Sequence, residues 1–397
     1  MFWNQKVLHK SKVKSCFMNR KEVGGMAKVR IGIIGIGGRG SSHAKFFTAG
    51  DIPDGELTAV CDVNPDRIQW ARENLGENVR TFDNGDDLIK SGAVDAIIIA
   101  TPHYDHPTFA VKGFEGGLHV LSEKPAGVYT KQVLEMNAAA EKSGKKFSMM
   151  FNQRTKAHHQ KLRELVSSGE LGEIQRTNYI ITSWFRSQSY YDRGDWRATW
   201  SGEGGGVLMN QCPHNLDLWQ WICGMPVRVR SFVGYGKYHN IEVDDDVTAY
   251  GEYENGATGV FITTTGEHPG SNRLEIAADR GKVVMENNKI TFWRSPVSVS
   301  EFSREYKGGF GSPEVWQCDV PPGKDGGSHR GVINNWCDAI LHDKDLLAPG
   351  AEGVQGVELA NAMLLSSWID DWVNIPVDQD LYYEKLQEKI KNSTSTK

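Results

Sequence analysis

Between residues 28 and 150, short apolar runs alternate with segments in which apolar and polar residues recur at helical spacing. The apolar runs are continuous, which is typical of strands buried on both faces of a sheet. Strands and helices in alternation predict an α/β fold with a doubly wound parallel sheet. The predicted strands are residues 28–34, 57–62, 94–100, 119–123 and 146–150, and the predicted helices after the first are residues 64–72, 86–89, 107–116 and 131–143.

After residue 151 the pattern changes to long segments with alternating apolar and polar positions. Such alternation is typical of half-buried strands, and turns such as Asn255-Gly256 separate them. We therefore expect a second α/β domain on a mostly antiparallel open sheet with one face covered. Its predicted strands are 174–182, 227–236, 247–254, 257–265, 273–278, 283–286 and 290–294, and its predicted helices are 154–172, 207–221, 329–341 and 352–372.

These patterns divide the chain into two domains, residues 27–150 and 151–376, between an extension at 1–26 and a tail at 377–397. The extension is basic but has no apolar stretch long enough for a signal sequence or a membrane span. We expect it to be disordered, and the folded pattern that begins at residue 28 also fits a translation start at Met18 or Met26.

The first strand runs directly into a glycine-rich turn, residues 35–40, with the sequence Gly-Ile-Gly-Gly-Arg-Gly. In a strand–turn–helix unit, Gly35 permits the tight turn, Gly37 lets a pyrophosphate approach the backbone, and Gly40 lets the helix pack on the strand. Backbone N–H groups at the helix start then face the anion. The turn predicts a dinucleotide site, and the alternative is a glycine-rich turn in another kind of parallel sheet.

A carboxylate strengthens this prediction and indicates which cofactor binds. Asp62 ends the second predicted strand, about 20 residues after the turn, where a carboxylate is expected to bind a ribose diol. It favours NAD over NADP, because a carboxylate repels a 2′-phosphate. Arg67 keeps NADP open as the less favoured cofactor.

Composition narrows the class of partner. The 397 residues suffice for two domain cores, and 39% hydrophobic and 24% charged residues are near globular values. The net charge of -5 gives no electrostatic reason to expect nucleic acid or an anionic membrane, so a small molecule fits better. The six cysteines show no C-x-x-C spacing, which indicates neither a zinc site nor a disulfide framework and favours the cytoplasm.

Two residues have the right chemistry for catalysis. Lys124 follows Glu123 at the end of a predicted strand and precedes a proline, in a position to overhang the cofactor. His214 follows a glycine-rich segment near a helix start, where an imidazole can be held neutral and act as a base. A solvated surface lysine and a hydrogen-bonded core histidine are the alternatives. Asp217 is placed to orient His214 or to cap the helix.

Four segments together resemble the Gfo/Idh/MocA family of pyridine-nucleotide sugar and polyol oxidoreductases. They are residues 35–40, Ala100-Thr101-Pro102, Glu123-Lys124-Pro125, and residues 205–217, in the family's order. The resemblance spans roughly residues 28–376 and implies that Lys124 and His214 flank the reacting carbon. It also implies a cofactor site, whose expected residues are Gly35, Gly37, Gly38, Arg39, Gly40, Asp62, Arg67, Thr101, Pro102, His106, Glu123, Lys124, Trp196 and Arg197.

The family often has an aspartate four residues before the histidine, whereas this chain has Asn210. An aspartate would stabilise the imidazolium that forms when the histidine takes a hydroxyl proton, while Asn210 can only fix the ring's orientation. We expect His214 to be the general base, Lys124 to stabilise the developing alkoxide, and hydride to pass to the nicotinamide. Lys124 as proton acceptor remains open.

The substrate is expected to be a sugar, glycoside or inositol with a secondary hydroxyl. A sugar pocket combines aromatic faces with polar side chains, and the expected substrate residues, together with Lys124, Asn210 and His214, are Asn152, Arg154, Trp184, Arg186, Tyr190, Trp196, Arg197 and His329. Two alternatives are an NAD-dependent glycosidase that oxidises the sugar transiently and a cofactor-binding regulatory protein without turnover.

Other polar clusters receive structural interpretations. We expect no metal site at His103, Asp105 and His106, because they lie in the turn that resembles the family's cofactor contact. We place His158-His159 on a helix surface and residues 244–246 at a solvated strand start. Because an open antiparallel sheet needs cover, we expect a homodimer or homotetramer.

Overall fold

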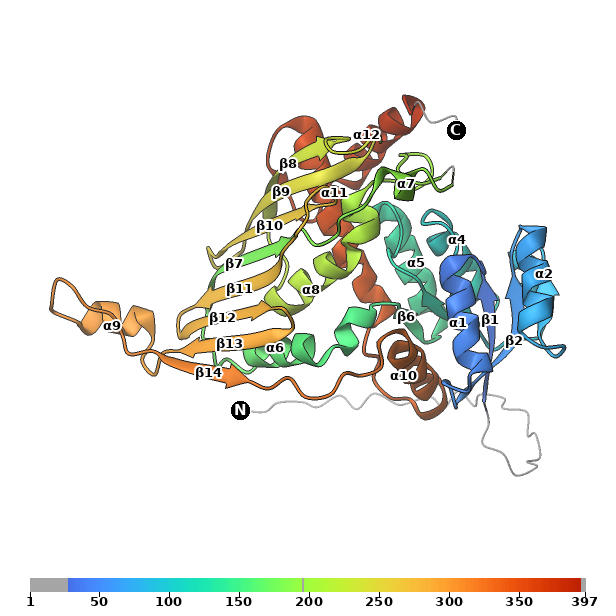
Figure 1. Ribbon diagram of the computed structural model, residues 1–397, viewed down its shortest axis with the longest axis horizontal. Coiled ribbons are helices and arrows are strands. Elements are labelled where there is room, and N and C mark those ends of the chain that lie inside the picture. The colour runs from blue at the N-terminus through green and yellow to red at the C-terminus, as the bar shows by residue number, and fades with distance from the viewer. Residues whose placement is uncertain (1–27, 195, 394–397) are drawn as a thin grey trace, which may run out of the picture.

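The computed structural model describes residues 28–194 and 196–393, so the predicted extension at 1–26 lies outside the described residues. The described residues form two sheets. Figure 1 shows one of them wrapped by helices, beside a large open sheet covered by helices on one face. None of the helices in the described ranges is long and apolar enough to cross a membrane.

The first sheet has six parallel strands in the order β3-β2-β1-β4-β5-β6, which is the order of a dinucleotide-binding doubly wound fold. Its central strands are apolar and buried on both faces, as the continuous apolar runs predict. Its elements are β1 (Val29–Ile34), α1 (Gly38–Thr48), β2 (Gly55–Cys61), α2 (Pro65–Asn74), β3 (Arg80–Phe82), α3 (Gly85–Lys90), β4 (Ala96–Ile99), α4 (Asp105–Glu115), β5 (His119–Ser122), α5 (Thr130–Ser143) and β6 (Phe147–Met149).

A helix from late in the chain completes this first domain. α10 (Ser328–His342) buries Trp336 and Cys337 in the same apolar cluster as Ile31 and Ile33 of β1. Figure 1 shows α10 beside α1. α10 lies in the segment predicted as the second domain, residues 151–376, but its apolar face covers the first sheet.

The second sheet has nine strands in the order β14-β13-β12-β11-β7-β10-β9-β8-β15, and only β7 and β10 pair in parallel. This confirms the mostly antiparallel open sheet. Its strands are β7 (Ile174–Ile181), β8 (Arg228–Tyr235), β9 (Asp244–Glu252), β10 (Thr258–Thr264), β11 (Asn272–Ala278), β12 (Gly281–Glu286), β13 (Lys289–Arg294), β14 (Trp316–Val320) and β15 (Val373–Asn374).

Helices cover one face of this sheet and form a common core with it. The stretch predicted as one helix at 154–172 is a short 3-10 turn, η1, followed by α6, and the stretch predicted at 207–221 is a π-helical turn, η2, followed by α8. Apart from α10, the helical elements after residue 151 are η1 (Asn152–Thr155), α6 (Ala157–Ser167), α7 (Gln188–Tyr191), η2 (Val207–Gln211), α8 (Pro213–Cys223), α9 (Val299–Glu305), η3 (Gly350–Glu352), α11 (Gly353–Ile369) and α12 (Gln379–Lys391).

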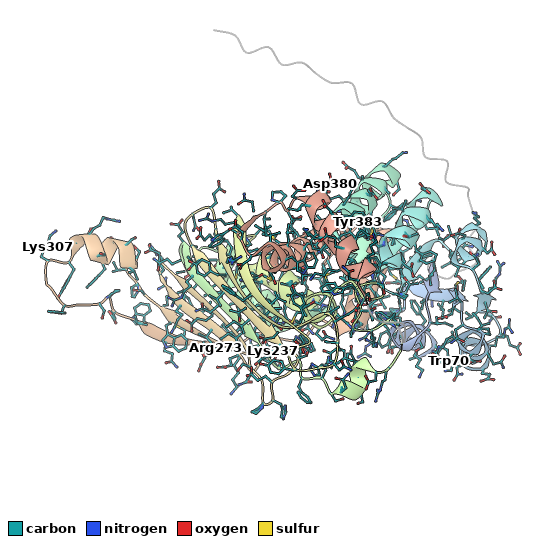
Figure 2. All side chains as sticks on the ribbon, turned by 90° about the horizontal axis from the view of Figure 1, so that it is seen from above. Trp70, Lys237, Arg273, Lys307, Asp380 and Tyr383 are labelled. Atoms are coloured by element: carbon teal, nitrogen blue, oxygen red, sulfur yellow. The ribbon has the colours of Figure 1, made fainter. Side chains whose placement is uncertain are left out.

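Two helices were not predicted from the sequence, α12 and α9. Residues 379–391, predicted as part of a tail, form α12, whose Tyr382 and Leu386 are buried in the core of the second domain. Residues 295–315, with α9, extend from the edge of the open sheet, and Figure 2 shows Lys307 at the far end of the molecule from Trp70.

Four polar residues expected at the surface are buried. His158 and His159 are 7% and 5% exposed, and the Nδ1 atom of His159 lies 2.9 Å from the carbonyl oxygen of Gln153. Asp244 and Asp245 are both 0% exposed, because their carboxylates accept hydrogen bonds from backbone N–H groups of neighbouring loops. The solvated interpretation of these residues was wrong, since a carboxylate satisfied by backbone donors can be buried.

Candidate functional site

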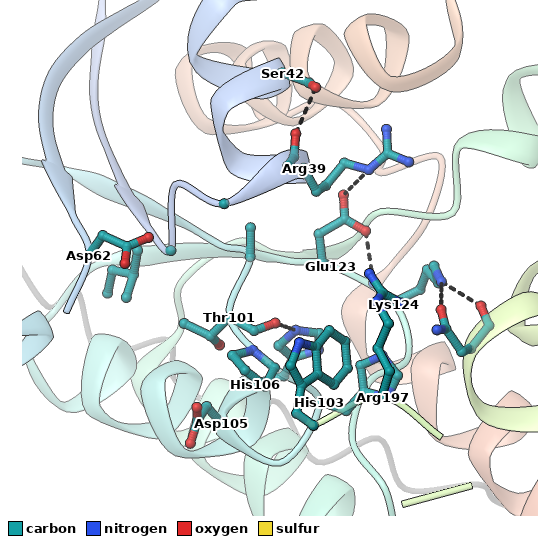
Figure 3. Close-up of a pocket in the computed structure, with 18 of the residues that line it drawn as sticks. Arg39, Ser42, Asp62, Thr101, His103, Asp105, His106, Glu123, Lys124 and Arg197 are labelled. Carbon is teal, nitrogen blue, oxygen red and sulfur yellow. Dashed lines mark hydrogen bonds and ion pairs between the residues drawn. The ribbon is translucent and has the colours of Figure 1, made fainter. Parts of the chain in front are cut away.

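A cavity with a volume of about 860 Å³ lies between the carboxyl ends of the first sheet's strands and the second domain. Figure 3 shows Asp62 at one end of this cavity and Lys124 and Arg197 at the other. Most predicted site residues line the cavity, namely Gly35, Gly37, Gly38, Arg39, Asp62, Thr101, Pro102, His106, Glu123, Lys124, Trp184, Arg186, Tyr190, Trp196, Arg197, Asn210 and His214.

The glycine turn has the geometry that a pyrophosphate needs. A β-carbon on Gly40 would lie 1.9 Å from the carbonyl oxygen of Gly35, so this position allows helix and turn to approach closely. A β-carbon on Gly37 would meet nothing within 4 Å, so the space before the N-terminus of α1 is open. The first turn of α1 has no acidic residue. The open space and the unopposed helix N-terminus therefore fit a dinucleotide phosphate.

Asp62 and Arg67 both bind the backbone of the glycine turn, at Ile36. Asp62 accepts hydrogen bonds from the backbone N–H groups of Ile36 at 2.8 Å and Asn64 at 2.9 Å. Arg67 does not line the cavity, because its Nε donates to the carbonyl oxygen of Ile36 and its guanidinium lies 4.9 Å from the ring of Trp70. Asp62 lines this end of the cavity, whereas Arg67 does not.

Glu123 is a buried carboxylate with a fixed charge. Its Oε1 lies 2.7 Å from Nε2 of His43 and 3.9 Å from Nε of Arg39. Burial alone would raise its pKa, but the hydrogen bond and charge of His43, with Arg39 and Lys124, lower the pKa of Glu123 to about 2. Glu123 is therefore ionised at every pH where the protein is expected to work.

Lys124 reaches from the end of β5 to the second domain. Its ammonium donates to the backbone oxygen of Asn210 at 2.6 Å and lies 3.4 Å from the Oδ1 atom of Asn210 (Figure 3). Burial lowers the pKa of Lys124, while the nearby carboxylates Glu123 and Glu203 oppose that effect. The side chain is a positioned cation, which rules out the solvated surface lysine.

Glu203 lies behind Asn210 and was not predicted as a site residue. Its Oε2 accepts from the backbone N–H of Ala198 at 2.8 Å, and its Oε1 accepts from Nδ2 of Asn210 and lies 3.8 Å from Nη1 of Arg197. The side chain is 1% exposed, and burial raises the pKa of Glu203 to about 7. The sequence feature that could have indicated Glu203 is its position between Gly202 and Gly204, because flanking glycines allow the backbone to turn a side chain into the interior.

His214 stands at the start of α8 and is neutral. Burial and the charge of Lys124 lower its pKa to about 3, and its Nδ1 is buried with no hydrogen-bond partner among the described residues. Asp217 does not orient it, because both Asp217 oxygens bind Arg154. A neutral imidazole facing the cavity has a lone pair that can accept a proton.

Aromatic side chains form the wall of the cavity in the second domain. The indole Nε1 of Trp184 donates to Oδ1 of Asn215 at 3.0 Å, which fixes this ring. The guanidinium groups of Arg186 and Arg197 lie 5.1 and 4.9 Å from the ring of Tyr190, and Arg197 donates to its hydroxyl. Flat rings among hydrogen-bonding groups suit a polyhydroxylated ligand.

Three expected substrate residues lie outside the cavity. The side chain of Arg154 is 0% exposed and makes a two-pronged contact with Asp217, at 2.9 and 2.5 Å, and a further contact with Glu352. Asn152 is 4% exposed and donates to Oγ of Ser328, and the ring of His329 lies 5.8 Å from that of His43. The expectation for Arg154 is corrected, because its guanidinium is fully engaged in the protein core.

The histidines after β4 hold backbone rather than a metal. His106 lies between two carbonyl oxygens, with Nδ1 2.7 Å from that of Pro125 and Nε2 2.9 Å from that of Thr101. Nδ1 of His103 lies 3.0 Å from the carbonyl oxygen of Glu203. These contacts fix the turns around the cavity, and no group of three or more metal-capable side chains in the described ranges is arranged to hold an ion.

Comparisons with known proteins agree with this geometry. Residues 29–151 match the oxidoreductase family described as an NAD-binding Rossmann fold, and residues 159–284 match the GFO/IDH/MocA C-terminal domain. D-glucoside 3-dehydrogenase of Escherichia coli (strain K12) is 31% identical over 57% of this chain, and the match spans 62% of that enzyme's length.

Two further relatives match over nearly their whole lengths. Glucose-6-phosphate 3-dehydrogenase of Bacillus subtilis (strain 168) is 27% identical over 92% of this chain and 97% of its own. The WlbA dehydrogenase of Bordetella pertussis, crystallised with NADH and UDP-GlcNAcA, superposes with a TM-score of 0.75 at 25% identity, over 88% of this chain and 100% of its own. The chain belongs to the Gfo/Idh/MocA family of oxidoreductases, and its first domain is the family's NAD-binding Rossmann domain.

Proposed function

We propose that the protein is an NAD-dependent dehydrogenase that oxidises a secondary hydroxyl of a sugar, glycoside or inositol. The observation that carries the proposal is the pairing of a cationic Lys124 with a neutral His214 on one cavity that begins at an open glycine turn. Bound NAD supplies the hydride acceptor. The glycine turn and Asp62 bind the cofactor, and Asp62 favours NAD over NADP.

Lys124 and His214 have different roles in removing the hydroxyl proton. Lys124 already donates to two oxygens of Asn210, and its remaining N–H is available to orient a substrate hydroxyl and to stabilise negative charge on that oxygen. His214 is neutral and accepts the hydroxyl proton as hydride leaves the carbon. Asp217 binds Arg154, so its carboxylate does not contact the unpartnered Nδ1 atom of His214 and does not stabilise positive charge on that ring.

The chemical class of the substrate rests on the aromatic wall and on relatives. Trp184 and Tyr190 present flat faces, and Arg186, Arg197 and Asn210 provide donors. The relatives named above carry dehydrogenase names with glucosides and glucose 6-phosphate as substrates. We infer a secondary carbinol on a pyranose or cyclitol ring as the reacting group.

A substrate panel tests the proposal. The purified protein is incubated with NAD and separately with myo-inositol, free sugars and aryl glucosides, while NADH absorbance and aryl release are followed together. We expect NADH formation that Lys124→Ala and His214→Ala each reduce by roughly 100-fold or more. Aryl release without net NADH would indicate the glycosidase instead, and NADH binding without any turnover would indicate a regulatory protein.

We also propose a homodimer or homotetramer built on the open face of the nine-stranded sheet. That face exposes Phe232 at 65% and Tyr250 at 39%, and such apolar area is usually covered. Light scattering after size-exclusion chromatography tests this, and a purely monomeric protein would contradict it. The cysteines among the described residues are free thiols, which agrees with a reducing compartment such as the cytoplasm.

A further inference from the structure

The base of the cavity contains an unbroken line of hydrogen bonds from Lys124 to a buried carboxylate. The Lys124 ammonium donates to the backbone oxygen of Asn210 at 2.6 Å and approaches its Oδ1 at 3.4 Å. The Nδ2 atom of the same Asn210 donates to Oε1 of Glu203. The other oxygen of Glu203 accepts from the backbone N–H of Ala198 at 2.8 Å. Every donor in this line therefore points toward Glu203.

The direction of these bonds requires an acceptor on both oxygens at position 203. With a glutamine there, the new N–H₂ group would face either the N–H of Ala198 or Nδ2 of Asn210, and each is a donor. If Asn210 rotated to avoid the second conflict, its own N–H₂ would face the Lys124 ammonium. A carboxylate at 203 satisfies all these groups, and an amide cannot.

Glu203 also compensates a local excess of positive charge. The nearest cations are Lys124, after β5, and Arg197, in the loop before η2, whose Nη1 lies 3.8 Å from Oε1. The phenols of Tyr190 and Tyr191 on α7 and the neutral His103 after β4 also face this region. None of these other groups carries a negative charge. Glu123 opposes the charge of Lys124 from the end of β5, and Glu203 is the carboxylate that opposes it from the side of Asn210.

We propose that Glu203 is a positioning residue of the dehydrogenase, which acts through Asn210 to keep Lys124 charged and directed into the cavity. The inference rests on the proposed function and extends it. It explains how the site works with an amide at position 210, since the negative charge is located one side chain farther from the lysine. Glu203 itself does not line the cavity, so its effect reaches the substrate through Lys124.

A structural role in the loop is the alternative, because Glu203 also holds Ala198, which has a positive φ of 58°. The test therefore compares three variants. Glu203→Gln removes the negative charge and places an N–H₂ group opposite another hydrogen-bond donor. Glu203→Gln/Asn210→Asp places the carboxylate beside Lys124, where the glutamine amide can donate to it while its oxygen accepts from Ala198. Thr199→Val is the loop control, because Thr199 bonds Trp196 and Gly202 without a charge.

The first measurement needs no substrate. Protein labelled with [¹³Cε]lysine is titrated by NMR, and the Lys124 signal is assigned as the one absent from Lys124→Arg. We expect the pKa of Lys124 to fall in Glu203→Gln and to recover in the double variant, with Thr199→Val like the wild type. An unchanged Lys124 titration in Glu203→Gln, or a Thr199→Val variant that reproduces the fall, would overturn the proposal whatever the substrate is.

The second measurement uses kinetics with myo-inositol or an aryl glucoside, whichever turns over. We expect Glu203→Gln to lower kcat by roughly tenfold, with the NADH dissociation constant unchanged in fluorescence titration, and the double variant to regain most of the loss. A double variant with a kcat no higher than that of Glu203→Gln would contradict the argument that the charge can be moved to position 210. Because Lys124 titrates without substrate, absence of turnover would count against the proposed function alone.

Discussion

The contact between Arg154 and Asp217 offers the sharpest test of the fold around the site. Both side chains are essentially inaccessible, at 0% and 1% exposure, and the guanidinium meets both carboxylate oxygens. Asp217→Asn keeps the shape but removes the charge, and it turns an amide N–H₂ group toward a guanidinium that has only donors. The arginine then retains a single carboxylate partner, Glu352, which is 36% exposed.

The expected cost follows from this burial. Breaking a buried ion pair by removing one partner destabilises a protein by about 3–5 kcal/mol, because the other charge stays buried. Glu352 still opposes the arginine here, so we expect the lower end, about 3 kcal/mol. Arg154→Met/Asp217→Leu replaces both charges by apolar groups and should be closer to the wild type than either single variant is.

Urea unfolding followed by tryptophan fluorescence measures this difference, with the transition of the second domain fitted separately since two domains need not unfold together. Steady-state kinetics are then measured at urea concentrations below the unfolding transition. We expect the KM for the sugar to be unchanged in the folded Asp217→Asn variant. A variant as stable as the wild type, but with a greatly raised KM, would refute the structural assignment and restore Arg154 as a substrate ligand.

Four further substitutions test the proposed cofactor site and the proposed base. Gly40→Ala should prevent stable folding of the first domain, because its β-carbon would lie 1.9 Å from the Gly35 oxygen. Gly37→Ala should fold normally, as measured by circular dichroism, because its β-carbon would meet no atom within 4 Å, and it should lose NADH affinity. Equal stability of the two variants would contradict the turn geometry. Asp62→Ala should reduce kcat/KM for NAD by roughly 10- to 100-fold, as for hydrogen bonds to a charged group, and raise relative use of NADP, so an unchanged cofactor ratio would remove Asp62 from the ribose site. His214 has a pKa lowered to about 3 by burial, so it stays neutral from pH 5 to 9, and His214→Ala should lower kcat without moving the acid limb of the pH profile. A limb near neutral pH that disappears in His214→Ala would show that the histidine titrates near neutral pH and would contradict its lowered pKa.

The sequence was most informative where one residue type is tied to one backbone requirement. Continuous apolar runs predicted the parallel sheet, and the glycine spacing placed the turn at its edge, because only glycine tolerates the approach seen at Gly40. Lys124 could be placed at the cavity because a residue that follows a parallel strand lies at the sheet's carboxyl edge. These inferences need only local periodicity and the topology it implies.

Contacts between residues far apart in the chain could not be predicted from the sequence. Arg154 resembled a ligand because nothing local shows that Asp217, 63 residues later, takes its guanidinium. The amphipathic pattern of residues 328–342 predicted a helix but not which sheet it covers, and α12 went unnoticed since a charged helix with two buried side chains has a weak pattern. Glu203 escaped notice for the same reason, because its importance comes from Asn210 and Ala198 placed around it by the fold.

Two buried carboxylates flank Lys124, and their environments shift their pKa values in opposite directions. Glu123 has His43 and Arg39 against it, which lower its pKa to about 2, so its charge is constant. Glu203 has one backbone donor, one amide and a more distant arginine, and burial dominates to raise its pKa to about 7. A pair of carboxyl groups separated in this way often marks a division of roles within a site. Here Glu123 supplies a permanent charge beside the lysine, while the charge on Glu203 changes near neutral pH, so the pH dependence of Lys124 should follow Glu203 and not Glu123.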